Sequence, residues 1–506
     1  MSDTLLQYLF TSLPFIVVVL LAVLAVLGMG LGLVWPRLLV YPYLCIFFWM
    51  NSTSYGSLSV FASPGVYSRG SGMLFFPLVL WYVLGAWCCA RVAAAFTQGN
   101  GQGIGLGGGP GIGQGGAPLG TSAGAAPCNL RPWFWGWTVL LAAHAVAAFV
   151  SSIPLKDALA PSGFSNIVWM GPLIGLMLLA FRTREHAIEL ARFIMLAGLG
   201  RALFGLGRWA AFGGDPNNVY ANRNAISIRL TFFDINDSLL CMLAFAIAAV
   251  FLFQAAQVRR ATLWRVLEWL TLGATAACIV LSYRRSAWFG FMLGFAVLLL
   301  RFPLRRRVQL VLGALPLVGS ALAYAALRRL GQTRGGSGLF YDMQSARFGP
   351  ESERVLELKL VLDDILARPF TGIGSWGRYS GYEQISWQAN PDGGLFLHSG
   401  VLHVALKCGL PGMALLAGTI CAFVLAARRA LRSLPPELLP LGTAGAAALA
   451  FMIPDVLIGT PFPQVRTTQM LAIAMALPYV ALVAGAAAPA PARTPRQRFR
   501  VHPVPA

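Results

Sequence analysis

The chain has 506 residues, of which 57% are hydrophobic and only 11% are charged, whereas soluble domains carry about 25% charged residues. The apolar residues stand in long runs without the polar alternation of a surface helix, which excludes a soluble globular protein. The net charge of +20 does not indicate nucleic acid, because the arginines cluster between the apolar runs, where basic residues set the orientation of membrane helices. We therefore expect an all-α polytopic membrane protein embedded in the lipid bilayer, with no nucleic-acid partner.

The apolar runs predict about thirteen transmembrane helices, since roughly 20 apolar residues are needed to cross a bilayer. The first run is too long for a signal peptide and lacks a basic segment before it, so we expect it to be retained. The second run is short and polar at its end, so twelve spans also fit. In chain order the runs are 13–34, 37–51, 73–96, 133–153, 164–181, 187–207, 238–256, 264–283, 286–302, 307–327, 410–427, 438–458 and 467–488.

The basic loops predict which ends of the spans face the cytoplasm. Arg301–Arg307 form the strongest marker. When the spans alternate, Arg259, Arg260, Arg265, Arg428–Arg432 and the basic C-terminal tail fall on the same side. Thirteen spans would place the N-terminus outside and twelve would place it inside, and both remain open.

These features divide the chain into six segments. Residues 1–96 hold the N-terminal spans, 97–132 a Gly-rich cytoplasmic linker, 133–327 the middle spans, 328–409 a large periplasmic loop, 410–488 the last spans, and 489–506 a basic cytoplasmic tail. The glycines of the linker neither follow a soluble strand nor open a helix, so a flexible linker is a better interpretation than a dinucleotide site.

The large loop contains a predicted amphipathic helix at Ser352–Leu366. We expect its apolar face to consist of Val355, Leu358, Val361 and Leu362. Arg368–Pro369 should end the helix, and the glycines that follow should form a turn. A long ordered loop between spans more often carries function than a short one does.

His398 and His403 lie where the large loop returns to the membrane, in the string FLHSGVLHVALKCGLPG. A neutral imidazole at a membrane surface can accept a proton from a hydroxyl near neutral pH. The alternative is an interfacial histidine without a role. His403 comes five residues later, so we expect it to face another side of a short helix and to pack. Pro411 and Gly412 mark the change from this helix into the next span.

Arg229, Arg284 and Arg285 should lie on the same side of the membrane as His398, if the spans alternate. A guanidinium binds phosphate with two hydrogen bonds and stays charged. Arginines at span ends can instead simply extend toward the headgroups. A base together with anion-binding groups suits transfer from a lipid-linked diphosphate.

The eight cysteines form no CxxC pair, and no Asp/Glu/His cluster has metal-ligand spacing. We therefore expect a metal-free reaction without a cofactor.

Four segments, taken in order, resemble the O-antigen ligase and polymerase superfamily (WaaL and Wzy proteins, which share a Wzy_C-type region). RLTFFDINDS is similar to a segment with the pattern Arg-x-x-Gly-x-Phe-x-x-Pro-Asn, although Phe232 and Ile235 replace its Gly and Pro. LSYRRSAWFGF is similar to a Ser-Arg segment, in which Arg285 fits the family arginine better than Arg284 because RSAW follows it. The other two matches are the loop helix with its Pro-x-x-Gly-x-Gly ending and the pattern His-Ser-x9-Gly-x-x-Gly beginning at His398.

The resemblance covers roughly residues 200–430 and implies a GT-C-like helical glycosyltransferase of the bacterial inner membrane. Such an enzyme takes a glycan from undecaprenyl diphosphate on the periplasmic side. The acceptor would be a hydroxyl of lipid A core, of a growing polysaccharide or of a protein. The resemblance implies that His398 is the base and that Arg229 and Arg285 hold the pyrophosphate, with Arg284 and Arg354 as further candidates.

Three functions remain open at this stage. The motif that begins at His398 favours a ligase, but exopolysaccharide and O-antigen polymerases share much of it. A flippase for lipid-linked sugars should carry charged residues inside its spans, whereas most charges here lie at span ends. A scaffold of a polysaccharide assembly complex would not need the His398, Arg229 and Arg285 set.

Overall fold

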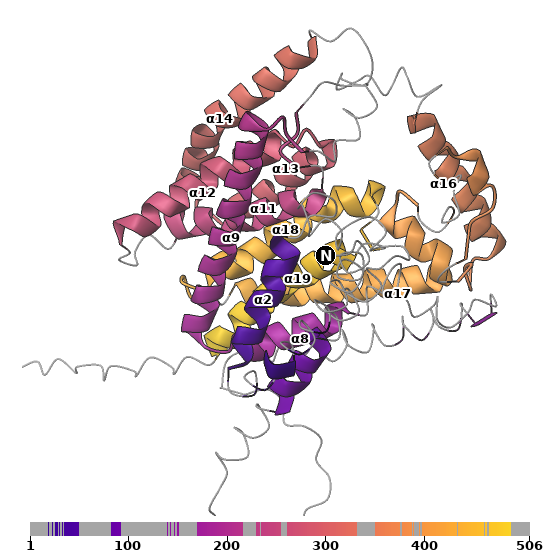
Figure 1. Ribbon diagram of the computed structural model, residues 1–506, viewed down its shortest axis with the longest axis horizontal. Helices are drawn as coiled ribbons and strands as arrows, with labels where there is room; N and C mark the ends of the chain where they lie inside the picture. The colour runs from indigo at the N-terminus through magenta and orange to yellow at the C-terminus, as the bar shows by residue number, and fades with distance from the viewer. Residues whose placement is uncertain are drawn as a thin grey trace, which may run out of the picture.

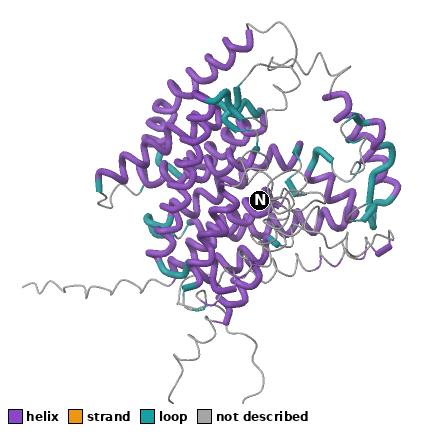
Figure 2. The backbone as a smooth tube through the Cα atoms, in the orientation of Figure 1, coloured by secondary structure: helices purple, strands orange, loops and turns teal. Residues whose placement is uncertain are grey.

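The computed structural model describes a helical protein. The described residues are 35–49, 82–92, 169–215, 229–254 without 233, 261–330, 350–374, 377–386, 397–432, 434–459, 461–462 and 465–486, with a few isolated positions elsewhere. The predicted spans 13–34 and 133–153, the linker 97–132, and the tail 489–506 lie wholly or largely outside them. Within this part of the chain every regular element is a helix (Figure 2).

Most helix bounds follow the apolar runs to within a few residues, but α17 begins ten residues before the predicted span 410–427. The labelled helices are α2 (Pro36–Trp49), α8 (Met170–Ala180), α9 (Arg184–Ala211), α11 (Ile235–Phe253), α12 (Thr262–Val280), α13 (Arg285–Leu299), α14 (Leu304–Leu330), α16 (Pro350–Ala367), the short 3-10 helix η3 (Tyr382–Gln384), α17 (Gly400–Leu431), α18 (Leu439–Ile458) and α19 (Val465–Ala486). Among the described residues, α9, α11, α12, the first part of α17, α18 and α19 are long and apolar enough to cross a membrane. The predicted all-α polytopic class is thus confirmed.

α11 is the centre of the bundle. From Ile235 to Phe251 every residue is buried. Asn236 and Asp237 find polar partners inside the bundle, and after Ser238 the segment carries no polar side chain that would need water. α9, α12 and α18 pack around it. A Cβ atom at Gly198 of α9 would clash with Ala244 of α11. Such small residues let membrane helices approach closely.

α13 and α18 run antiparallel in close contact. A Cβ atom at Gly294 of α13 would lie 2.8 Å from the carbonyl oxygen of Ala447, and one at Gly290 would clash with the carbonyl of Phe451. The N-terminal end of α13 therefore lies beside the C-terminal end of α18.

The bundle has two chemically different ends. We call one the His398 end, formed by the first residues of α11, α13, α17 and α19 and the last residues of α9, α12 and α18. We call the other the basic end, with Arg301, Arg305–Arg307, Arg428 and Arg432. Arg301 lies within electrostatic range of Arg428 and Arg432. These clusters therefore share one end, as the alternation of spans predicts.

α16 lies at the edge of the molecule beyond α17, away from α12 and α14 (Figure 1). Its bounds include the predicted loop helix, which ends where Arg368–Pro369 stops it. The predicted apolar face is partly wrong, because Val355 is 65% and Leu362 44% exposed. The buried side of the helix instead consists of Glu357, Val361 and Ile365. These three residues are spaced four positions apart, so they lie on one side of the helix. That side is buried because the rest of the loop packs against it.

The loop is fastened to a break in α17. Gly409 leaves the helical conformation with φ 70° and ψ 178°, close to the change of helix predicted at Pro411. Backbone hydrogen bonds on both sides of the break join α17 to the segment 369–374. The buried Lys407 adds a bond from its ammonium group to the carbonyl of Gly377. The helix that begins just after His398 and the loop therefore form one packed unit.

Candidate active site

His398 forms a hydrogen-bonded pair with Glu357 of α16. The two residues are 41 positions apart in the chain, and the His398 Nδ1 atom lies 2.9 Å from the Glu357 Oε2 atom. The Glu357 side chain is completely buried, whereas the His398 side chain is 30% exposed. The imidazole is thus held from the protein side while part of it remains open to a substrate.

Three more donors hold the Glu357 carboxylate in place. The backbone N–H of His398 donates to Oε2 at 3.2 Å. The hydroxyl of Tyr379 and the amide of Gln388 donate to Oε1 at 3.3 Å and 3.1 Å. The Gln388 side chain is itself fixed, because its oxygen accepts from the backbone N–H of Gly394 at 3.1 Å. The loop therefore encloses the carboxylate with donors on both oxygens.

This arrangement determines the tautomer of the imidazole. A carboxylate oxygen only accepts hydrogen bonds, so Nδ1 of His398 must carry the hydrogen. The lone pair of the neutral ring is then on the Nε2 atom. A carboxylate that orients a histidine in this way is the arrangement of a general base.

The ends of α13, α17 and α18 meet beside His398. A Cβ atom at Gly400 would lie 2.9 Å from the carbonyl oxygen of Val456, so the start of α17 touches the end of α18. Arg284 precedes the first residue of α13 and is half-buried. The carboxylate of Asp455 near the end of α18 lies within electrostatic range of both Arg284 and His398. Arg284, one of the predicted arginines, and His398, the predicted base, therefore both lie near the Asp455 carboxylate.

The other predicted arginines lie at the same end but are placed differently. Arg285 begins α13 with an exposed side chain, and Arg229 is exposed in the segment before α11. Arg354 lies on α16, one turn before Glu357, and is half-buried. The predicted packing role of His403 is in line with its burial, since it is only 1% exposed.

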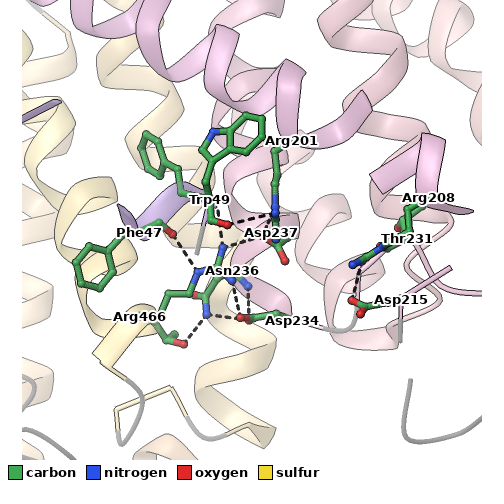
Figure 3. Close-up of polar contacts among 12 residues, drawn as sticks. Phe47, Trp49, Arg201, Arg208, Asp215, Thr231, Asp234, Asn236, Asp237 and Arg466 are labelled. Atoms are coloured by element: carbon green, nitrogen blue, oxygen red, sulfur yellow. Dashed lines mark hydrogen bonds and ion pairs between the residues drawn. The ribbon is translucent and has the colours of Figure 1, made fainter. Parts of the chain in front are cut away.

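A buried network of ion pairs lies under the His398 end (Figure 3). The Oδ1 atom of Asp237 accepts from Arg201 at 2.9 Å and from Arg466 at 2.7 Å. Arg466 also binds Asp234 at 2.7 Å, and Asp234 accepts from the side chain of Asn236 at 2.8 Å. The network joins the beginnings of α11 and α19 to α9.

The same two arginines bind the end of α2. Arg466 donates to the carbonyls of Phe47 and Phe48, and Arg201 donates to the carbonyl of Trp49. The last carbonyls of a helix have no partner within that helix, and cations are favourable there. The network therefore ties four helices together below the site.

Arg208 forms a separate buried ion pair at this end. It binds Asp215 at 2.9 Å and donates to the carbonyl of Thr231 at 2.5 Å. Its guanidinium also lies 5.1 Å from the ring centre of Phe232, and Arg201 lies 4.5 Å from the same ring. Phe232 thus packs against two buried cations.

Sequence reasoning missed Glu357, Asp455 and the pairs around Asp237. The sequence contained a signal for Glu357, because an acidic residue interrupts the otherwise apolar stripe of a helix in a motif-bearing loop. The pairing of Arg466 with Asp237 joins residues 229 positions apart. Charged residues near span ends gave no indication that they would pair inside the bundle.

The region that contains His398, Glu357, Arg284, Arg285 and Arg354 also matches a known family. The family model described as O-antigen ligase (Wzy_C) matches residues 270–417, from the middle of α12 to the first part of α17. Arg229 and Arg466 lie outside the match. No curated protein matches the chain. Residues 270–417 are thus similar to an O-antigen ligase (Wzy_C) region, in agreement with the resemblance of the sequence motifs.

Proposed function

We propose that this protein transfers a glycan from undecaprenyl diphosphate to an acceptor hydroxyl at the periplasmic face of the bacterial inner membrane. The acceptor would be lipid A core, a polysaccharide or a protein. The observation that carries the proposal is the 2.9 Å contact between His398 and the buried Glu357. Both residues lie within the O-antigen ligase match.

The proposed reaction uses His398 as the base. The Nε2 atom takes the proton of the acceptor hydroxyl while the hydroxyl oxygen forms a bond to the anomeric carbon of the donor sugar. The bond between that carbon and the phosphate oxygen breaks, and undecaprenyl diphosphate leaves with the electron pair. Glu357 keeps the imidazole oriented and stabilises its positive charge after the proton has moved.

Arginines would stabilise the diphosphate as its negative charge grows. Arg284 is the first candidate, because it shares the electrostatic neighbourhood of Asp455 with His398. Arg285, Arg229 and Arg354 are further candidates at the same end. Since these residues can supply positive charge, we propose that the reaction is independent of metal ions.

The proposed orientation follows from the two ends of the bundle. Arg301, Arg428 and Arg432 share the basic end, and clusters of this kind favour the cytoplasmic side. His398 precedes the first residue of α17, whereas Arg428 lies in its last turn. The site would accordingly face the periplasm.

A lipid-linked sugar flippase is the second candidate. It is favoured by the buried charges of Arg201, Asp237 and Arg466, because ionisable residues inside a membrane often mark a transport path. These side chains, however, bind one another and the end of α2. A structural role explains these contacts without a transport path.

The test uses His398→Ala and Arg284→Ala in a strain that lacks its own copy, with His186→Ala in α9 as the control histidine. Surface glycans and undecaprenyl-linked glycans are profiled after equal membrane levels have been verified. We expect lipid-linked glycan to accumulate and mature product to disappear in the two site variants only. The reducing end of the wild-type product then separates a ligase from a polymerase. Wild-type profiles in both site variants would exclude the proposed site and favour a flippase or scaffold.

A further inference from the structure

The basic end contains a cluster of three arginines that the proposed reaction does not use. Arg301 follows α13, whereas Arg428 and Arg432 belong to the last turn of α17 and the residue after it. Positions 127 residues or more apart in the chain are thus brought within electrostatic range. Arg305–Arg307 at the start of α14, a turn without acidic residues, add further positive charge nearby.

The three arginines have no carboxylate partner among the described residues. Arg301 is half-buried, and its charged neighbours are Arg432 and Arg428. Burial and then these two cations lower the pKa of the Arg301 guanidinium from its ordinary value. A partly desolvated cation among like charges is unfavourable unless an anion accompanies it. The polypeptide described does not supply that anion.

The surroundings of the cluster place it at the level of lipid headgroups. Leu300 and Leu304, on either side of Arg301, are 70% and 73% exposed. Val308 and Leu312 continue this exposed apolar surface along α14. In a membrane protein such a surface faces lipid tails, and the arginines at its edge then meet the phosphates.

We propose that Arg301, Arg428 and Arg432 form a binding site for the headgroup phosphate of an anionic phospholipid. Arginine suits this ligand because its planar guanidinium matches phosphate oxygens and remains charged. The lipid would join α17, which begins beside the catalytic base, to the turn between α13 and α14. The site does not depend on the proposed glycosyl transfer.

The test measures binding of dioleoylphosphatidylglycerol to the full chain, purified in a non-ionic detergent, by native mass spectrometry. Dioleoylphosphatidylcholine serves as the zwitterionic comparison and inorganic phosphate as the free anion. The cluster variant is Arg301→Gln with Arg428→Gln. The matched control is Arg265→Gln with Arg368→Gln, which removes the same charge from exposed positions on α12 and just after α16. Arg428→Gln alone, at an exposed position, covers the case in which the double variant does not fold.

We expect phosphatidylglycerol to bind the wild type and the control in preference to phosphatidylcholine. The cluster variants should lose affinity by about fivefold for each arginine removed. An equal loss in the control would show a diffuse effect of charge and would overturn the proposal. Inorganic phosphate that binds as tightly as the lipid would also overturn it, because the site would then take a free anion.

Discussion

His398 depends on a partner that lies in another part of the large loop. Glu357 accepts from the imidazole, from the backbone N–H of His398 and from two further side chains. A completely buried carboxylate with donors on both oxygens has little freedom to turn. The proton on Nδ1 and the lone pair on Nε2 are therefore consequences of how α16 packs.

Glu357→Gln should lower glycosyl transfer by about a hundredfold or more, because the amide cannot stabilise the imidazolium and can favour the wrong tautomer. The measurement is the rate of product formation in membranes that contain equal amounts of protein.

The matched control for Glu357→Gln is Glu353→Gln. Glu353 lies one turn earlier on α16 and accepts from the backbone and hydroxyl of Ser386 at 3.0 Å and 2.7 Å, so it holds the loop without contacting the imidazole. A comparable loss of activity in the Glu353 variant would show that the loop, and not the tautomer, was affected.

Tyr379→Phe should lower the rate only a few-fold, because one of four donors to Glu357 is lost, at a net cost of about 0.5–1.5 kcal/mol. Burial and then the Glu357 carboxylate raise the pKa of the Tyr379 hydroxyl above its ordinary value. The hydroxyl therefore keeps its proton and donates throughout the neutral range. The ratio of variant to wild-type rates should be the same from pH 6 to pH 9, and a ratio that changes steeply would contradict this role.

At the scale of elements, the break in α17 connects the loop to the membrane part. Gly409 has a positive φ, and a Cβ atom there would lie 2.5 Å from the carbonyl oxygen of Phe370. The helix on one side carries His403 and Lys407, and the longer part on the other side runs to the basic end. Only glycine combines this backbone conformation with the close approach of the loop.

Gly409→Ala should destabilise the junction by at least about 1 kcal/mol, since both the backbone and the contact are strained. Thermal unfolding of the detergent-purified protein should shift to a lower temperature. Gly418→Ala is the control on the same helix, because a Cβ atom there meets nothing within 4 Å. Equal stability of the two variants would contradict the proposed role of the break.

Hydrophobic runs predicted the helices well and the contacts between them poorly. The run 238–256 anticipated α11 (Ile235–Phe253), because the thickness of a bilayer alone fixes the length of an apolar helix. The apolar stripe of α16 was misjudged at Val355 and Leu362, since which side of a helix is covered depends on tertiary packing. His398 could be found because a family motif surrounds it, whereas the place of Glu357 opposite it required the fold.

At the scale of the whole molecule, ion pairs replace apolar contacts where the His398 end is assembled. Arg201, Asp237 and Arg466 are completely buried and join α9, α11 and α19, and the two arginines also bind the end of α2. A buried ion pair contributes little net stability compared with apolar residues. Removing one partner is nevertheless destabilising, because it leaves the other charge buried without a counter-charge. The network therefore determines the relative positions of these helices more than it raises the stability of the bundle.

Asp237→Asn should lower the stability of the whole protein by about 3–5 kcal/mol, because two buried arginines lose their shared carboxylate. Folded protein in membranes, measured by size-exclusion chromatography after extraction, should fall sharply. Glu189→Gln breaks an exposed pair with Arg37 and should have little effect. Normal yield of the Asp237 variant would mean that the network is dispensable for assembly.

The most direct measurement follows transfer by the purified full-length protein in detergent or liposomes, with an undecaprenyl-diphosphate-linked glycan and a candidate acceptor. Release of undecaprenyl diphosphate and formation of the glycosylated acceptor are both recorded for the wild type, His398→Ala, Glu357→Gln and Glu353→Gln. We predict equal amounts of the two products from the wild type and from Glu353→Gln, and almost none from the other two variants. Transfer at the wild-type rate by His398→Ala would contradict the assignment of His398 as the base.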